Sequence, residues 1–364
     1  GREGAVLEAH RVAVGASGRN GGHMTSGIAE SFGAAAAHLG EDGARRLWQA
    51  FNDSIDLIEQ IVSEESIECN FRRSGKLKLA SKPSHVPRIK GMSEEIARTV
   101  DSSVRWLDRD ALKDEIGSDR FYGGVLYPKS GMAHMGNYAV GLADASARHG
   151  ASIWEQAPVT SQTRKNGRWT LETTKGALSA RNVILATEAY RTKNLPYLKQ
   201  RIIPIASFIV ATRPLSLEEV VVTLPGDRNY VNSLNIPNYF RLTPDRRILF
   251  GGRAQFSSDS NPVTDAKSGV LLRRQLLGML PQLESVALDY CWGGLVGCSR
   301  DRYPRIGCAD NMHFAAGYSG HGAQFSTLAG SILADKVMGF EGTNPLEGMS
   351  WPAIPLYSGK PWFM

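Results

Sequence analysis

A short apolar run that ends in an acid is the first stretch whose residue types could do chemistry. Val6 and Leu7 precede Glu8 and Ala9, and a glycine-rich loop follows at residues 15–22. In a dinucleotide-binding βαβ unit, the acid at the end of the second strand accepts hydrogen bonds from a ribose diol. By itself the apolar run fits an ordinary strand and turn equally well. The spacing to the loop favours a nucleotide site.

The glycine-rich loop reads Gly-Ala-Ser-Gly-Arg-Asn-Gly-Gly. Glycine has no Cβ, so the backbone of such a loop can lie close to a phosphate. Polar side chains between the glycines can add contacts to the same group. We expect the cofactor contacts of this loop to come from Ser17, Gly18, Arg19, Asn20, Gly21 and Gly22.

A second glycine-rich loop lies near the end of the chain, at residues 317–322. An apolar run at residues 312–316 predicts a buried strand before it, and the apolar spacing after it predicts a helix at residues 323–338. The free N–H groups and the dipole of a helix N-terminus favour a bound anion. The expected contacts are Gly320, His321, Gly322 and Ala323. His321 alone also fits a packed loop histidine.

Both loops resemble the flavin-binding segments of the D-amino-acid oxidase and sarcosine oxidase superfamily, and residues 15–22 resemble most its gamma-glutamylputrescine oxidase branch. The resemblance implies FAD, with the ribose on Glu8 and Ala9 and the pyrophosphate and flavin along the first loop. The second loop would stabilise the negative charge of the reduced flavin. The family's tethering cysteine aligns with Gly294, so we expect non-covalent FAD.

Further cofactor contacts follow from the same resemblance. The backbone of Val159 resembles the family's contact to the adenine, and Ala186 and Thr187 end the strand at residues 182–187 that returns to the FAD sheet. This strand usually ends Ala-Thr-Gly, and Glu188 replaces the glycine here. The family's first strand, with its Gly-x-Gly-x-x-Gly turn and the helix after it, should precede Gly1. We therefore expect a longer parent protein; a complete chain without that turn would place FAD binding in doubt.

The fold class that these patterns predict is α/β (α+β overall), with a Rossmann-like FAD-binding domain and an antiparallel substrate sheet. The FAD-binding domain is expected at residues 1–70, 135–195 and 297–345, the substrate domain at residues 71–134 and 196–296, and a C-terminal tail at residues 346–364. We also expect a long helix at residues 41–65, a hairpin at residues 71–80 that turns at Ser74 and Gly75, and a helix at residues 268–280.

Flavin-dependent amine oxidation does not require a protein base, so no catalytic triad is expected. The candidates for lining the substrate site are Tyr239, Arg241, His23, Tyr318 and Gln324. Tyr239 and Arg241 share a strand that should face the flavin, with the arginine reaching a distal carboxylate; an ordinary sheet with an exposed arginine is the alternative. His23 and Gln324 stand where the resemblance places the carboxylate-binding arginine and lysine of sarcosine oxidases, which argues against a sarcosine or glycine substrate.

The sequence thus predicts an FAD-dependent oxidoreductase that oxidises the C–N bond of an extended, gamma-glutamylputrescine-like amine, giving an imine that hydrolyses. The electron acceptor would be oxygen or another carrier. The alternatives are a D-amino-acid, N-methyl amino acid or glycine oxidase or dehydrogenase, and a non-catalytic fragment or binding subunit that has lost the pyrophosphate turn.

Composition excludes several other classes of protein. The 364 residues carry a net charge of only +6, without a Lys/Arg block, so a nucleic-acid partner is not expected. No apolar run reaches the roughly 18 residues of a membrane span. The four cysteines form no Cys-x-x-Cys pair, which predicts free thiols, no metal site and a reducing, cytoplasmic location.

Overall fold

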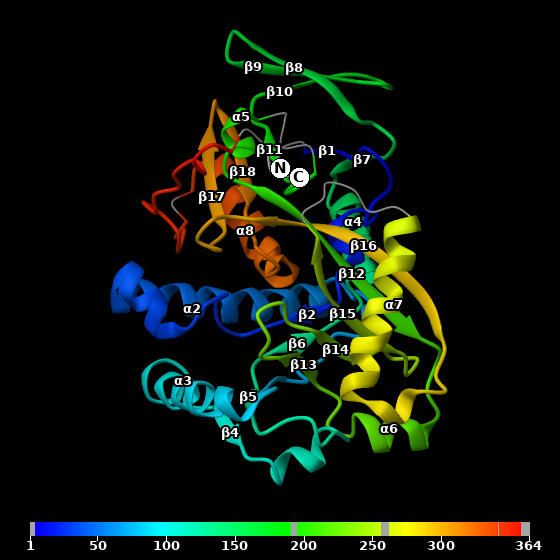
Figure 1. Cartoon of the computed structure of the whole chain (residues 1–364). Coiled ribbons are helices and arrows are strands. Elements are labelled where there is room, and N and C mark those ends of the chain that lie inside the picture. Colours follow the sequence, from blue (N-terminus) through cyan, green and yellow to red (C-terminus); the bar gives the residue numbers. More distant parts are fainter. Residues whose placement is uncertain (1–3, 191–194, 256–261, 341, 358–364) are drawn as a thin grey trace.

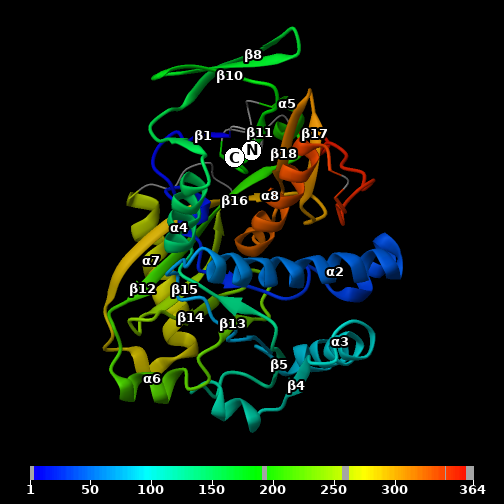
Figure 2. The same ribbon diagram turned by 180° about the vertical axis from the view of Figure 1, so that it is seen from behind.

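Helix α2 (Phe32–Glu64) runs across the middle of the molecule, with most of the largest sheet on one side and most of the smaller sheets on the other (Figures 1 and 2). The computed structural model describes residues 4–190, 195–255, 262–340 and 342–357. Ser31 caps α2 by accepting a hydrogen bond from the Ala34 N–H at 3.2 Å. Gly40, with φ of 71°, interrupts the helix, and the regular part after it confirms the helix predicted at residues 41–65.

The largest sheet has eight strands. In spatial order they are β16 (Leu288–Cys298), β12 (Ile203–Thr212), β15 (Ile248–Gln255), β14 (Tyr239–Leu242), β13 (Asn229–Asn232), β3 (Lys76–Leu79), β5 (Gly124–Tyr127) and β4 (Arg105–Leu107). All neighbours are antiparallel except β13 and β3, which run parallel. The sheet is therefore mixed rather than purely antiparallel, because two distant chain segments meet where β13 and β3 pair.

The hairpin predicted at residues 71–80 is wrong. β3 pairs with β5 and β13 instead, and Arg72 forms an isolated bridge with Met132. Gly75, at φ of 73°, turns the chain into β3, and its N–H donates to the Ser130 carbonyl at 2.9 Å. Alternating apolar residues predict a strand but not its partner, which explains the error.

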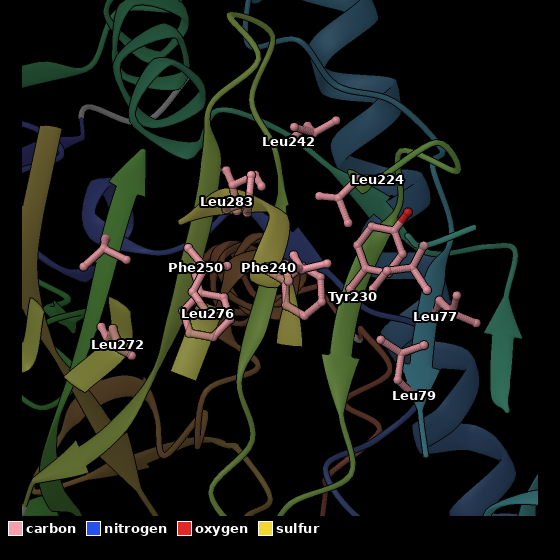
Figure 3. Packing of buried hydrophobic residues seen from close by; sticks show 14 of the residues in the cluster. Leu77, Leu79, Leu224, Tyr230, Phe240, Leu242, Phe250, Leu272, Leu276 and Leu283 are labelled. Atoms are coloured by element: carbon pink, nitrogen blue, oxygen red, sulfur yellow. The ribbon is translucent and has the colours of Figure 1, made fainter. Parts of the chain in front are cut away.

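The main hydrophobic core lies on one face of the large sheet. Tyr230, Phe240 and Phe250 stack along three neighbouring strands, with successive ring centroids 5.1 and 5.7 Å apart (Figure 3). Helix α7 (Pro262–Met279) adds Leu272 and Leu276 to this core and is longer than the helix predicted at residues 268–280. Each large apolar side chain that is fully buried stabilises the fold by roughly 1.5–3 kcal/mol, so this core fixes the position of the opposite face.

The smaller sheets contain the parallel pairs expected of a nucleotide-binding fold. β1 (Ala5–Leu7) is parallel to β7 (Ser152–Trp154), and β11 (Ile184–Leu185) is parallel to β18 (Met312–Ala316). The strand predicted at residues 182–187 pairs only over β11. The remaining strands are β2 (His23–Met24), β6 (Gly131–Met132), β8 (Val159–Lys165), β9 (Arg168–Thr173), β10 (Gly176–Ala180) and β17 (Arg305–Ala309).

The other helices are α1 (Ala16–Arg19), α3 (Val86–Thr99), α4 (Met135–Arg148), α5 (Pro196–Lys199), α6 (Leu217–Thr223) and α8 (Gly322–Met338), with 3₁₀ turns at Pro83–His85, Ala111–Asp114 and Pro281–Leu283. None of the described helices combines the length and the apolar character needed to cross a bilayer. The division into two domains stays a prediction, and residues 358–364 of the predicted tail lie outside the described residues.

Candidate active site

One cavity of about 3200 Å³ is bordered by both glycine-rich loops, which are about 300 residues apart in the sequence. Pockets for drug-sized ligands have volumes of roughly 300–1,000 Å³, so this cavity has room for a much larger ligand. Most residues proposed from the sequence line it: Glu8, Ala9, Ser17, Arg19, Asn20, Gly21, His23, Val159, Ala186, Thr187, Tyr239, Tyr318, Gly320, His321, Gly322 and Ala323. Gly18, Gly22, Arg241 and Gln324 do not.

The side chains of the first loop shape its backbone. Asn20 accepts the Gly22 N–H at 2.9 Å and donates to the Ser17 carbonyl at 2.9 Å. Arg19 donates to the Val14 carbonyl at 2.7 Å and to the Gly293 carbonyl at 3.0 Å, which ties the loop to β16. These polar groups are already engaged, so the loop offers its ligand mainly backbone and small side chains.

Gly18 and Gly22 are glycines for steric reasons. A Cβ on Gly18 would lie 2.1 Å from the Ala13 carbonyl oxygen, and a Cβ on Gly22 would lie 2.1 Å from that of Ala133. Gly22 also has φ of 73°, which L-residues rarely adopt. Both residues therefore pack against neighbouring backbone on the side of the loop that faces away from the cavity.

The second loop joins β18 to α8 through three residues with positive φ: Gly317, Ser319 and Gly320. The first-turn N–H groups of α8 have no acceptor within the helix, and Gly322 and Ala323 line the cavity. Burial lowers the pKa of His321 to about 4 and that of His23 to about 3. Both imidazoles are therefore neutral at pH 7, and the helix dipole remains to stabilise an anion here.

Glu188, which replaces the family's glycine, clamps this second loop. Its carboxylate accepts the Gly317 N–H at 2.9 Å and the Tyr318 N–H at 3.2 Å. A Cβ on Gly297 would lie 2.2 Å from the Glu188 Oε1, so that position must stay glycine. Burial raises the pKa of Glu188 to about 7, and the backbone hydrogen bonds oppose that rise.

We expect Glu188→Gln to remove a pH dependence of stability. A carboxyl whose pKa is raised by folding contributes stability below its ordinary pKa of 4.5, and this contribution is lost as pH rises through about 7. The loss corresponds to about 3 kcal/mol in the free energy of unfolding. Folding lowers the pKa of His23 and His321, which opposes this trend equally in every variant, so the measure is a difference. In denaturant titrations at pH 4.5 and 8, the wild type and Glu172→Gln, whose carboxylate is exposed, should lose this stability relative to Glu188→Gln. An equal pH slope in Glu188→Gln would contradict this role.

Tyr239 forms part of the cavity wall beside the first loop. Its ring meets the His23 ring edge-on, with centroids 5.4 Å apart, and its hydroxyl lies 3.4 Å from the Ser207 hydroxyl. A Cβ on Gly251 would lie 2.2 Å from the Tyr239 ring, so position 251 must stay glycine for the ring to lie here. Tyr318 lines the same cavity from the second loop, and burial raises the pKa of its phenol.

Arg241 does not reach the cavity, which corrects the expectation that it binds a substrate carboxylate. The side chain is 3% exposed, and its guanidinium donates to the carbonyls of Gly21 at 2.6 Å, Ala133 at 3.0 Å and Leu242 at 3.0 Å. Gln324 is also outside the cavity: it is 1% exposed and donates to a carbonyl of the segment after β2. Both side chains fix backbone segments behind the site.

Two lysines that line the cavity were not among the sequence candidates. Lys76 and Lys78 both lie on β3. The signal was the alternation Lys-Leu-Lys-Leu, which places both lysines on one face of a strand. The sequence does not show that this face borders the cavity, because β3 takes its neighbours from segments near residues 124 and 229.

A strand–loop–helix anion site and a second glycine-rich loop that border one large cavity are typical of a dinucleotide-binding enzyme. The chain belongs to the DAO family of FAD dependent oxidoreductases, whose model matches residues 1–336. It is 34% identical to the probable oxidoreductase OrdL of Haemophilus influenzae, covering 99% of this chain and 83% of that protein. It is 31% identical to the gamma-glutamylputrescine oxidoreductase of Escherichia coli, covering 92% and 78%.

Solved structures show the same fold. The glycine oxidase of Geobacillus kaustophilus superposes with a TM-score of 0.79 at 22% identity, covering 96% of this chain and 92% of that chain. The predicted fold class, the family and FAD as the cofactor are thus confirmed.

Two buried polar atoms that lack hydrogen-bond partners indicate that the residues of the cavity fit FAD. The Thr187 hydroxyl and the His23 Nε2 are buried without a hydrogen-bond partner among the described residues, and both side chains line the cavity. Buried polar atoms are nearly always satisfied, so these two atoms indicate a ligand with polar groups. Glu8 lines the end of the cavity formed by β1 and accepts the His10 N–H at 2.8 Å, a place suited to a ribose.

Proposed function

We propose that the protein oxidises a C–N bond of an extended amine. The observation that carries this proposal is that the cavity continues without interruption from the two loops to the sheet wall at Tyr239, so that cofactor and substrate share one space. Similarity to a gamma-glutamylputrescine oxidoreductase supports the amine class. Bound FAD would supply the hydride acceptor.

The protein's own residues bind and orient the reactants in this scheme. With FAD bound, Glu8 would hold the ribose, the loop at residues 15–22 would hold the pyrophosphate, and the N-terminus of α8 would stabilise negative charge on the flavin ring. Tyr239 and Tyr318 provide an aromatic wall that excludes water. Neutral His23 and His321 add no charge next to the reacting centre. The product is an imine, which water hydrolyses.

A panel of amines tests the proposal. The purified full-length protein is expected to be yellow, with flavin bands near roughly 375 and 450 nm, and acid precipitation should release the flavin, since we propose non-covalent binding. Under anaerobic conditions, extended amines should bleach these bands faster than glycine, sarcosine or D-amino acids. Faster bleaching by the small amino acids would favour the amino acid oxidase alternative, and a colourless folded protein would favour a non-catalytic role.

The electron acceptor and the location follow as separate proposals. Oxygen consumption by the amine-reduced protein identifies an oxidase, whereas reoxidation only by an added carrier identifies a dehydrogenase. We propose a cytoplasmic location, which is supported by the four free cysteines.

A further inference from the structure

Strand β3 has two chemically distinct faces. Leu77 and Leu79 are fully buried in the main core, whereas Lys76 and Lys78 point to the opposite side and line the cavity. Figure 3 shows the two leucines pointing into the core beside Tyr230. Because side chains alternate along a strand, the packing of the leucines fixes the lysines toward the cavity.

The lysine face continues the wall that carries Tyr239. Val231 on β13 is paired with Tyr239 on one side and with Lys78 on the other, and all three residues line the cavity. Neighbouring strands lie roughly 4.8 Å apart, which places the backbone of Lys78 about 10 Å from that of Tyr239. A molecule that lies across these strands can therefore touch Tyr239 at one end and Lys78 at the other.

The wall around Lys78 is rich in positive charge. Burial lowers the pKa of Lys78, and the charges of Arg88 and Arg302, which line the same cavity, lower it further. In the described part of the chain Lys78 has no hydrogen-bond or ion-pair partner. Glu30 lies beside Arg302 in this wall, and burial raises the pKa of its carboxyl. A half-buried cation without a partner is costly, and an incoming anion would relieve that cost.

Lys76 is held differently and lies nearer the two loops. Its ammonium donates to the Ser26 carbonyl at 3.1 Å and lies 4.2 Å from the centre of the Tyr127 ring. Its charge contributes to the lowered pKa of both His23 and His321. Lys78 has no such contacts within the described ranges, so it is the lysine that remains available to a ligand.

We propose that Lys78, assisted by Arg88 and Arg302, binds a carboxylate at the end of the amine substrate remote from the oxidised C–N bond. This inference rests on the proposed function and narrows the substrate class to extended amines with a distal carboxylate. It places the anion site on β3, two strands away from Tyr239, instead of on β14 at Arg241.

The test compares two amines of equal length, one ending in a carboxylate and one in a carboxamide. A hydrogen bond to a charged group contributes about 1.5–3 kcal/mol, so the wild type should prefer the carboxylate by roughly 10- to 100-fold in kcat/KM. Lys78→Met should bring this ratio close to one, mainly by raising KM for the carboxylate. Lys78→Arg should keep part of the preference. Lys82→Met removes an exposed lysine outside the cavity and should change nothing.

Binding without turnover provides an independent readout. Pentanoate and pentanamide, which are not oxidised, are titrated calorimetrically into wild type, Lys78→Met and Lys82→Met. Pentanoate should bind at least tenfold more weakly to Lys78→Met alone. Equal binding of the two ligands to the wild type, or an equal loss for both amines in Lys78→Met, overturns the proposal. If no amine bleaches the flavin but pentanoate binding depends on Lys78, the proposed function fails and the anion site stands.

Discussion

Gly22→Ala should destabilise the protein by about 4 kcal/mol and abolish FAD retention. The new methyl group would lie 2.1 Å from the Ala133 carbonyl oxygen and 2.6 Å from an Arg241 nitrogen, in a backbone conformation with φ of 73°. Neither neighbour can yield, because both belong to the hydrogen-bonded support of the first loop. Denaturant unfolding and the flavin-to-protein absorbance ratio measure the two effects.

Gly167→Ala is a control that separates the steric clash at Gly22 from the strain of a positive φ. Gly167 also has a positive φ, 77°, but a Cβ there meets nothing within 4 Å. This control should lose only about 1 kcal/mol and keep its flavin. If both variants lost the same stability, the close approach at Gly22 would not be what fixes the loop.

Arg241→Met should cost about 3 kcal/mol or more and reduce flavin retention, since it removes the donor from carbonyls on three segments. Arg241→Lys should not rescue the protein, because one ammonium group cannot reproduce the fork of a guanidinium. The preference between carboxylate and carboxamide amines should remain as in the wild type. Unfolding titrations and the substrate pair together check these outcomes.

Measuring both stability and substrate preference of Arg241→Met also decides between two roles for Arg241. A substrate-binding arginine would give a stable variant with a higher KM for the carboxylate amine only. Arg164→Met, which removes an exposed arginine from β8, serves as the control for loss of positive charge. A stable Arg241→Met protein with a selective KM effect would restore the hypothesis made from the sequence.

The sequence predicted the two loops and the long helices well because local rules encode them. Glycines in turns and apolar spacing act over a few residues. The helix at residues 41–65 and the helix after the second loop are cases of this kind. The nucleotide motifs are contiguous as well, so they can be recognised without knowing what packs against them.

Apart from the bounds of elements such as α7, the errors concern partners that are distant in the sequence. The strand alternation places Arg241 on the same side as Tyr239, but the loop that covers its guanidinium is more than 200 residues away. Glu188 was recognised as a departure from the family pattern, yet its partners at residues 297 and 317–318 come from the other end of the chain. Lys78 was missed because a hairpin was the simplest pairing for β3. Local sequence patterns do not predict tertiary contacts of this type.

The two-sided character of β3 also bears on how such a protein can diverge. Substituting Lys76 or Lys78 changes the lining of the cavity, while Leu77 and Leu79 stay packed in the core. Substrate selectivity can therefore change at two positions at little cost to stability. Deleting one residue just before β3 would instead shift its register by one residue. The two lysines would then point into the hydrophobic core and the two leucines toward the cavity. The two cavity-facing positions of this strand can therefore vary, whereas its two leucines and its length cannot.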